Sequence, residues 1–298
     1  MNTKYELVKT DTKEVNGKTL YRIRALVAIG KTVAAGDLGG HIEAEENLSV
    51  SGKAWVHGNA RVYGNAHVSG DAQVYGNARV SGAALVSGNA NVSGDARVYG
   101  NALVFDDARV HGDVWVYGDA WVHGNARVYG NAHVSGDAQV YGNALVFDDA
   151  RVYGNAHVHG DARVYGNAQV SGDARVSGDA LVYGDDCYLL VGPAKSSSQF
   201  TTAHKDAALG VRVNCGCFTG TVREFSDAIE ETHANNKIAL EQYRLFRQLI
   251  ASNFPGLVGF VDREVAAMRH EQTEQGNETA LRPGFDFEET AGPIEIDP

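Results

Sequence analysis

Three arginines recur along the chain at equal intervals, namely Arg61, Arg79 and Arg97. Guanidinium groups present a planar fork of donors that suits carboxylate and phosphate groups. A fold that stacked positions separated by this interval would also place Tyr63 and Tyr99 on the same face. Stacked guanidiniums over tyrosine rings could hold a small anion or a carboxylate-rich partner. The alternatives are a solvated face and a contact between protomers.

A second candidate for anion binding lies near the C-terminal end. Gly216 and Thr219-Gly220-Thr221 precede a segment with helical periodicity, whose free amides could bind an anionic ligand. Thr221-Val222-Arg223-Glu224 also fits a capping box, which would satisfy those amides internally. The two interpretations are compatible, because Thr219 and the loop amides could still face a ligand.

Cysteine chemistry is the third possibility. Cys215 and Cys217, two residues apart in a predicted strand, could join Cys187 and His204 in a zinc site, or Cys217 could act as a nucleophile with His204 as its base. The spacing does not match the Cys-x-x-Cys pairs of zinc sites. The sequence therefore favours small buried core thiols, and it predicts neither a metal site nor catalytic residues.

All these residues must be positioned by a hexapeptide repeat. Every sixth residue from Val50 to Val182 is valine, within the pattern Ala-x-Val-x-Gly-Asn/Asp. This period is typical of a parallel β-helix built from hexapeptides. Alternation along each strand turns alanine and valine inward, and glycine occupies the corner in all but two hexads, where Asp106 and Asp148 stand. Three hexads make one coil, so the run predicts between seven and eight coils with no room for a cofactor inside.

The histidines of the repeat fall at outward positions, where Tyr, Ser, Arg or Gln alternate with them. They are therefore interpreted as surface substituents rather than catalytic bases. Long sequence stretches also recur at offsets of 11 and 7 hexads. Because neither number of hexads is a multiple of three, the copies fall on different faces. Copying without regard to face suits a spacer better than an active site. The outward histidines are His57, His67, His111, His123, His133, His157 and His159.

The rest of the chain divides around this run. Residues 1–49 are predicted to form an N-terminal β cap and entry segment, and residues 50–185 the β-helix. Residues 186–270 are predicted to be a small α/β module with helices over Val222–His233 and Lys237–Ser252. A further short helix is expected over Val261–His270. Residues 271–298 are acidic and are predicted to be disordered.

The hexads resemble those of hexapeptide-repeat proteins with left-handed parallel β-helices, many of which are trimeric acyltransferases. The stretch from Gly39-Gly40 to Asn47-Leu48-Ser49 is similar to the entry segment of YdcK-like hexapeptide proteins and of phage and prophage relatives. The resemblance implies a left-handed helix, a homotrimer and a phage or prophage origin. It also implies coenzyme A as the cofactor of the acyltransferase alternative.

Charge and composition narrow the function further. The net charge is −11, which disfavours binding to duplex nucleic acid. The chain starts without a signal-peptide pattern and contains no membrane-spanning run, so we expect a cytoplasmic protein with no membrane partner. The leading hypothesis is a non-enzymatic trimeric scaffold that presents a module for a protein partner or a small anionic, nucleotide-like molecule, sequestered from the host. The alternatives are an acyl-coenzyme A-dependent acyltransferase and a virion component.

Overall fold

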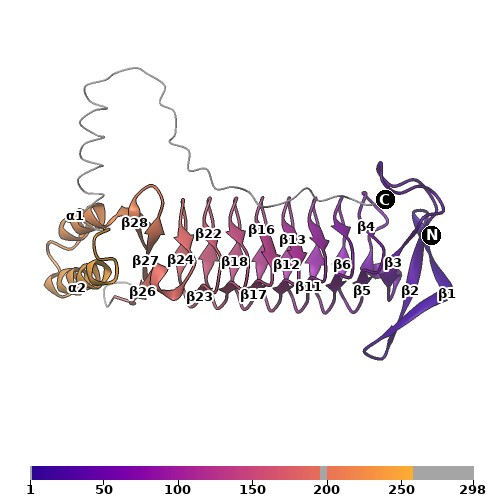
Figure 1. The fold of residues 1–298 in the computed structure, drawn as a ribbon, viewed down its shortest axis with the longest axis horizontal. Helices are drawn as coiled ribbons and strands as arrows, with labels where there is room; N and C mark the ends of the chain where they lie inside the picture. Colours follow the sequence, from indigo (N-terminus) through magenta and orange to yellow (C-terminus); the bar gives the residue numbers. More distant parts are fainter. Residues whose placement is uncertain (1, 195–199, 258–298) are drawn as a thin grey trace, which may run out of the picture. The chain divides into compact units, whose positions relative to one another are not determined.

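The computed structural model describes residues 2–194 and 200–257, which form a parallel β-solenoid of about eight turns with an antiparallel cap at each end (Figure 1). The predicted fold class is confirmed. The short helix predicted over Val261–His270 and the disorder predicted for residues 271–298 lie outside the described residues. None of the described helices is long and apolar enough to cross a membrane.

The solenoid has three faces, each a parallel sheet whose strands pair in register with those of the coils before and after. Face I consists of β3 (Leu38–Ile42), β5 (Arg61–Val62), β8 (Arg79–Val80), β11 (Arg97–Val98), β14 (Trp115–Val116), β17 (His133–Val134), β20 (Arg151–Val152) and β23 (Gln169–Val170). Face II consists of β4 (Trp55–Val56), β7 (Gln73–Val74), β10 (Asn91–Ser93), β13 (Arg109–Gly112), β16 (Arg127–Gly130), β19 (Leu145–Val146), β22 (Arg163–Val164) and β25 (Leu181–Val182). Face III consists of β6 (His67–Val68), β9 (Leu85–Val86), β12 (Leu103–Val104), β15 (Trp121–Val122), β18 (Gln139–Val140), β21 (His157–Val158) and β24 (Arg175–Val176).

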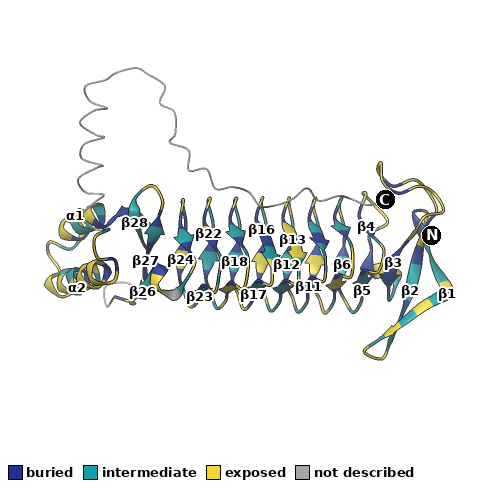
Figure 2. Cartoon of the chain, in the orientation of Figure 1, coloured by how far each residue is buried: buried dark blue, intermediate teal, exposed yellow. Residues whose placement is uncertain are grey.

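The interior is the predicted double stack of valine and alanine, and both columns are buried from Ala54 and Val56 to Ala180 and Val182 (Figure 2). Val50 is an exception, because its side chain is 55% exposed. Leu48 takes the inward place instead and forms a parallel bridge with Val68, the residue that regular counting by coils would pair with Val50. The strict hexad register therefore begins at Val56, although parallel pairing already starts where β3 meets β5.

The corners explain the glycine column. Gly100 has a φ of +73°, and an added Cβ would lie 3.0 Å from the backbone nitrogen of Gly118 in the next coil. A side chain is therefore disfavoured both by conformation and by space. Asp106 and Asp148 adopt positive φ angles of 58° and 57° at the two corners without glycine. Asp106 compensates with a carboxylate that accepts a hydrogen bond of 3.2 Å from the Gly124 amide, one coil further on.

The N-terminal cap is a hairpin of β1 (Tyr5–Val15) and β2 (Lys18–Ala25), which turns at Asn16 and Gly17. Strand β2 pairs antiparallel with β3, so the hairpin extends face I beyond the first coil. The short 3-10 helix η1 (Glu45–Asn47) then leads into the coils. This arrangement places residues of β1 and β2 next to the first strands of face I.

The C-terminal cap begins after the short 3-10 helix η2 (Asp185–Cys187). It is an antiparallel sheet of β26 (Tyr188–Val191), β27 (Thr201–Asp206), β28 (Gly210–Cys215) and β29 (Phe218–Thr221). The helices α1 (Val222–Thr232) and α2 (Lys237–Asn253) pack on it around a second core that includes Phe225, Tyr243 and Ile250. Both helices begin at the predicted residues.

Candidate functional site: an arginine ladder on face I

The three predicted arginines do form a ladder. Arg61 pairs in register with Arg79, and Arg79 with Arg97, on consecutive strands of face I. Strand spacing in a sheet is about 4.8 Å, so adjacent arginines bring like charges close together. Their repulsion amounts to roughly 1 kcal/mol per adjacent pair even at the dielectric constant of water. We call the side chains of Arg61, Arg79 and Arg97 the arginine ladder.

No described carboxylate forms an ion pair with the arginine ladder. The Nε atom of Arg61 is buried and has no hydrogen-bond partner among the described residues. In contrast, the neighbouring Arg22 donates to Asp11 at 2.7 Å and to the Gly39 carbonyl at 2.9 Å. The ladder can therefore still donate hydrogen bonds to an external anion. Such a bond would be favourable, because a buried donor without a partner costs free energy.

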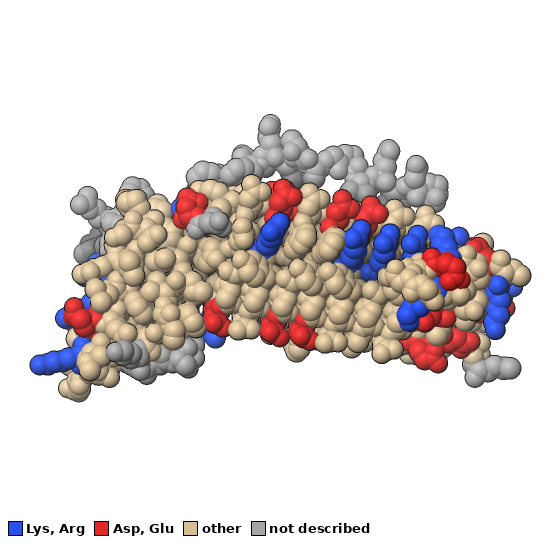
Figure 3. Space-filling view, turned by 90° about the horizontal axis from the view of Figure 1, so that it is seen from below, with Lys and Arg blue, Asp and Glu red and all other residues tan. Residues whose placement is uncertain are grey.

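The N-terminal hairpin adds positive charge at one end of the ladder. Burial lowers the pKa of Lys13, and the guanidiniums of Arg61 and Arg22 lower it further. The Lys13 amine donates to Asn59 Oδ1 at 3.4 Å, two residues before Arg61. Figure 3, which views the molecule from the side of face I, shows basic side chains in a row along the solenoid toward the N-terminal cap.

Aromatic rings border the other end of the ladder. Arg97 lies over the ring of Trp115 at 4.7 Å from its centroid. In the second outward column of the same face, Tyr99 stacks on Tyr117 with centroids 5.0 Å apart and ring planes 3° from parallel. Sequence reasoning placed Tyr63 and Tyr99 on this face but missed the contributions of Lys13 and Trp115. The latter follows Arg97 at the same interval that separates the arginines, so the repeat could have shown it.

His204, predicted as a binding residue, lies fully buried where β27 crosses the last coil. Its Nε2 accepts from the Ser177 amide at 3.4 Å and the Asn214 Nδ2 at 3.1 Å, while its Nδ1 donates to the Lys205 carbonyl at 3.2 Å. Burial lowers the pKa of His204 to about 4, so the ring is neutral at pH 7. The Ser177 amide would be an open donor at the end of face III without this contact. His204 therefore completes the hydrogen bonds of the solenoid end.

The predicted residues of β29 are also engaged internally. Thr219 donates to Asn214 Oδ1 at 2.8 Å, which links it to the His204 network. Thr221 and Glu224 form the predicted capping box: the Thr221 amide donates to the Glu224 carboxylate at 2.9 Å, and the Glu224 amide donates to Thr221 Oγ1 at 3.1 Å. Gly220 is buried against Phe218 and Glu224, where an added Cβ would lie 2.8 Å from a carboxylate oxygen. The arginine ladder is consequently the more accessible of the two predicted anion sites.

The cysteine prediction requires correction. Cys187 is buried in the solenoid core as expected, but Cys215 is only partly buried and Cys217 is exposed. Strand β28 ends at Cys215 and β29 starts at Phe218, so the two cysteines do not share a strand face. The turn at Gly216, with a φ of +59°, separates them. Among the described residues, no three or more His, Cys, Asp and Glu side chains gather as metal ligands do.

The outward histidines of the solenoid all have neighbours that explain their positions. His57 stacks on Tyr75 at 4.3 Å and hydrogen-bonds Gln73 at 2.8 Å. His123 and His159 belong to a ring column on face III with Phe105 and Tyr141, at centroid distances of 4.7 to 5.1 Å. The remaining contacts join His67 to the Glu46 carbonyl, His111 to Ser93, His133 to Trp115, and His157 to Tyr141. Burial lowers the pKa of His57, His123, His133, His157 and His159.

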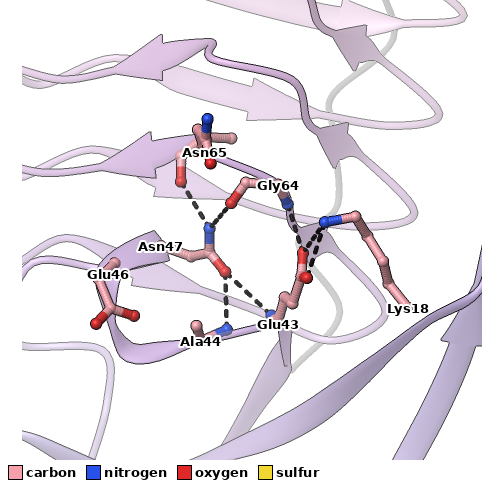
Figure 4. Close-up of a pocket in the computed structure, with 8 residues that line it drawn as sticks. Lys18, Glu43, Ala44, Glu46, Asn47, Gly64 and Asn65 are labelled. Atoms are coloured by element: carbon pink, nitrogen blue, oxygen red, sulfur yellow. Dashed lines mark hydrogen bonds and ion pairs between the residues drawn. The ribbon is translucent and has the colours of Figure 1, made fainter.

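A cavity of about 450 Å³ lies beside the entry segment (Figure 4). Asn47, whose side chain is buried, donates to the carbonyls of Gly64 and Ala66 and accepts from the amides of Glu43 and Ala44, all at 2.8 to 3.1 Å. The Glu43 carboxylate pairs with Lys18 at 2.8 Å and accepts from the Gly64 amide at 2.7 Å. These polar groups satisfy one another. The cavity therefore marks the joint between the hairpin and the coils.

The repeats match a known family. Residues 72–88, 96–112, 138–150, 146–160 and 168–184 match the model of the YdcK beta solenoid repeat. These matches all lie within the solenoid, so its repeats are similar to those of YdcK.

The crystal structure of a Bacillus cereus protein described as a candidate acetyltransferase is similar at a TM-score of 0.28 with 13% sequence identity. The alignment covers 68% of this chain and 96% of that one. No curated protein matches the sequence.

Proposed function

We propose that this protein is a non-enzymatic β-solenoid scaffold whose arginine ladder binds a small anionic ligand. The observation that carries the proposal is the absence of any ion pair between Arg61, Arg79 or Arg97 and the described carboxylates, although the stacking of coils forces the three charges together. An anion on the ladder would relieve that repulsion and supply acceptors to open donors. The stacked coils fix the three arginines on consecutive strands, one strand spacing apart.

A scaffold role also agrees with the state of the histidines. Each outward histidine of the solenoid already contacts an aromatic ring or shares a hydrogen bond with a neighbouring coil or the entry segment. These contacts give the imidazoles a structural role along the faces. We further propose that the protein acts as a homotrimer, which would present three ladders.

The test is a calorimetric titration of the full-length protein with pyrophosphate at low ionic strength. We expect saturable binding that weakens at least ~100-fold in the variant R61Q/R79Q/R97Q, because each charge-assisted hydrogen bond contributes roughly 1.5–3 kcal/mol. The matched control is R109Q/R127Q/R163Q on face II, which removes the same charge from another outward column. It should bind within about threefold of the wild type.

The ladder variant should not unfold earlier than the wild type, because the substitution removes like-charge repulsion at partly exposed positions. Equal losses of affinity in both variants would show a general charge effect and would contradict a site on face I. Wild-type protein that does not bind pyrophosphate would reject the proposal altogether.

A further inference from the structure

The second outward column of face I runs beside the arginine ladder and receives one residue from each coil. Next to the ladder, one of these residues has no aromatic ring. Consecutive coils place Tyr63, Ser81, Tyr99 and Tyr117 in this column, since the Tyr63 amide donates to the Val80 carbonyl and the Ser81 amide to the Val98 carbonyl. Ser81 is half-buried, so its level is open to solvent. We call this position the Ser81 level.

The dimensions of the solenoid suit one additional ring at this level. Several pairs of rings on adjacent coils stack at similar centroid distances: 4.7 Å for Phe105–His123, 4.9 Å for Tyr129–Phe147 and 5.0 Å for Tyr99–Tyr117. Tyr63 and Tyr99 stand two coils apart, which is roughly 9.6 Å at ordinary strand spacing. A planar ring midway between them would meet both tyrosines at about the distance that the native stacks use. The second face of Tyr99, opposite Tyr117, is directed toward that level.

The guanidiniums of the arginine ladder lie close enough to the Ser81 level for one ligand to reach both. Arg79 lies in β8 and Ser81 follows directly after this strand, and residues two apart in extended backbone are about 6.6 Å apart. Arg61 and Arg97 flank Arg79 on the adjacent coils. A ligand whose ring occupied the Ser81 level could therefore place an anionic group on the ladder without leaving the face. A nucleoside phosphate has this chemistry: a planar base at one end and phosphate at the other.

The next position of the same column without a ring is less exposed than Ser81 and has no arginine beside it. Ser135 stands between Tyr117 and Tyr153 but is only 8% exposed. The outward residue two positions before it, in β17, is His133, which stacks on Trp115 at 5.3 Å, so the place that Arg79 takes beside Ser81 holds no guanidinium here. The Ser81 level combines an open position, two flanking tyrosines and three guanidiniums.

We propose that the Ser81 level receives the planar base of a nucleoside phosphate between Tyr63 and Tyr99, with its phosphates on the arginine ladder. This inference rests on the proposed function, and it adds the aromatic half of the ligand. Base stacking on aromatic side chains tolerates different bases, because every base has a π-face. The site would therefore select for a planar ring with an attached phosphate rather than for one particular base.

The experiment compares ADP with pyrophosphate, which is the same diphosphate without the nucleoside. Wild-type protein should bind ADP at least about tenfold more tightly than pyrophosphate in calorimetric titrations, which is the contribution expected of stacking. The variant S81Y fills the level with its own ring, so ADP affinity should fall to the level of pyrophosphate while pyrophosphate affinity stays within about threefold.

The matched control is S87Y on face III. There the new tyrosine adds a ring next to Phe105, on a column that already carries stacked rings, and it should leave both affinities unchanged. The variant Y63L/Y99L provides an independent check, since it should abolish the preference for ADP without adding a ring. Equal affinities of the wild type for ADP and pyrophosphate would overturn the aromatic site while leaving the anionic ladder intact. Absence of binding for both would overturn the two proposals together, and retained ADP preference in S81Y would place the base elsewhere.

Discussion

The imidazole of His204 is held neutral by its surroundings. It has no exposed surface, and its two nitrogens serve as one acceptor and one donor in a network with Ser177, Asn214 and the Lys205 carbonyl. Protonation would turn the acceptor Nε2 into a donor that faces the donors of Ser177 and Asn214. At the scale of single residues, this histidine therefore makes the C-terminal joint sensitive to acid.

This sensitivity has a defined pH window. The pKa of His204 is about 4 in the folded protein, against an ordinary value of about 6.5 in the unfolded chain. Between these values the unfolded state binds a proton that the folded state excludes, so stability is complete above pH 6.5 and falls as the pH drops toward 4, by about 3 kcal/mol in total. Melting curves recorded from pH 7.5 to pH 4.5 should fall more steeply for the wild type than for His204→Gln, which cannot titrate. Parallel curves would show that His204 is not the responsible group.

At the scale of elements, the entry segment is joined to the coils through one amide side chain. Asn47, in η1, makes four hydrogen bonds that connect the backbone after β3 to the corner that follows β5 (Figure 4). Its removal would take away the partners of the Gly64 and Ala66 carbonyls and of the Ala44 amide, whereas the Glu43 amide would keep its bond of 3.1 Å to the Val62 carbonyl. Leu48, and not Val50, pairs with Val68 and enters the core. This change of register depends on Asn47, because the backbone between Leu48 and Val56 must be held away from the core.

We therefore expect Asn47→Ala to lower the free energy of unfolding by roughly 2–4 kcal/mol, the cost of leaving buried groups unsatisfied. Urea denaturation would measure it, and hydrogen exchange at the Ala44 amide should accelerate. Asn77→Ala is the control, since Asn77 occupies an exposed corner of the regular coils and should change stability by less than about 0.5 kcal/mol. Comparable losses in both variants would contradict a special anchoring role for Asn47.

At the scale of the whole molecule, face III carries an exposed apolar row that suits contact with another copy. Leu85, Leu103 and Trp121 pair in register on consecutive coils, and Leu85 and Trp121 remain 43% and 40% exposed. The ring column that starts at Phe105 runs beside them. An exposed apolar row of this kind is typical of a protein–protein contact.

We predict that the proposed homotrimer uses this row. Native mass spectrometry of the wild type should show a trimer, and the variant L85E/W121E should dissociate it, because the contact would bury unpaired carboxylates. The variant Q73E/N91E on face II adds the same charges to a polar column and should remain trimeric. A trimer that survives in L85E/W121E would assign the contact to another face, and a monomeric wild type would contradict the homotrimer itself.

The sequence by itself determined the solenoid and the arginine ladder. Each hexad repeats the same local geometry, so counting by single hexads locates the buried valines, and counting by three hexads places Arg61, Arg79 and Arg97 on one face. The capping box at Thr221 was equally predictable, because its partners are close neighbours in the chain. In each case the contacts repeat with the period or are local in the chain, and a periodic pattern carries that information directly.

Only the tertiary structure decided what happens where the period stops. Val50 belongs to the sequence pattern but points outward, because Leu48 reaches the core first and Asn47 holds the intervening backbone. Lys13 meets the ladder through a hairpin that folds back on face I, and His204 meets Ser177 through a strand laid across the last coil. These contacts join segments that no repeat relates. Their geometry follows from how the two caps pack on the solenoid, which is a property of the folded chain as a whole.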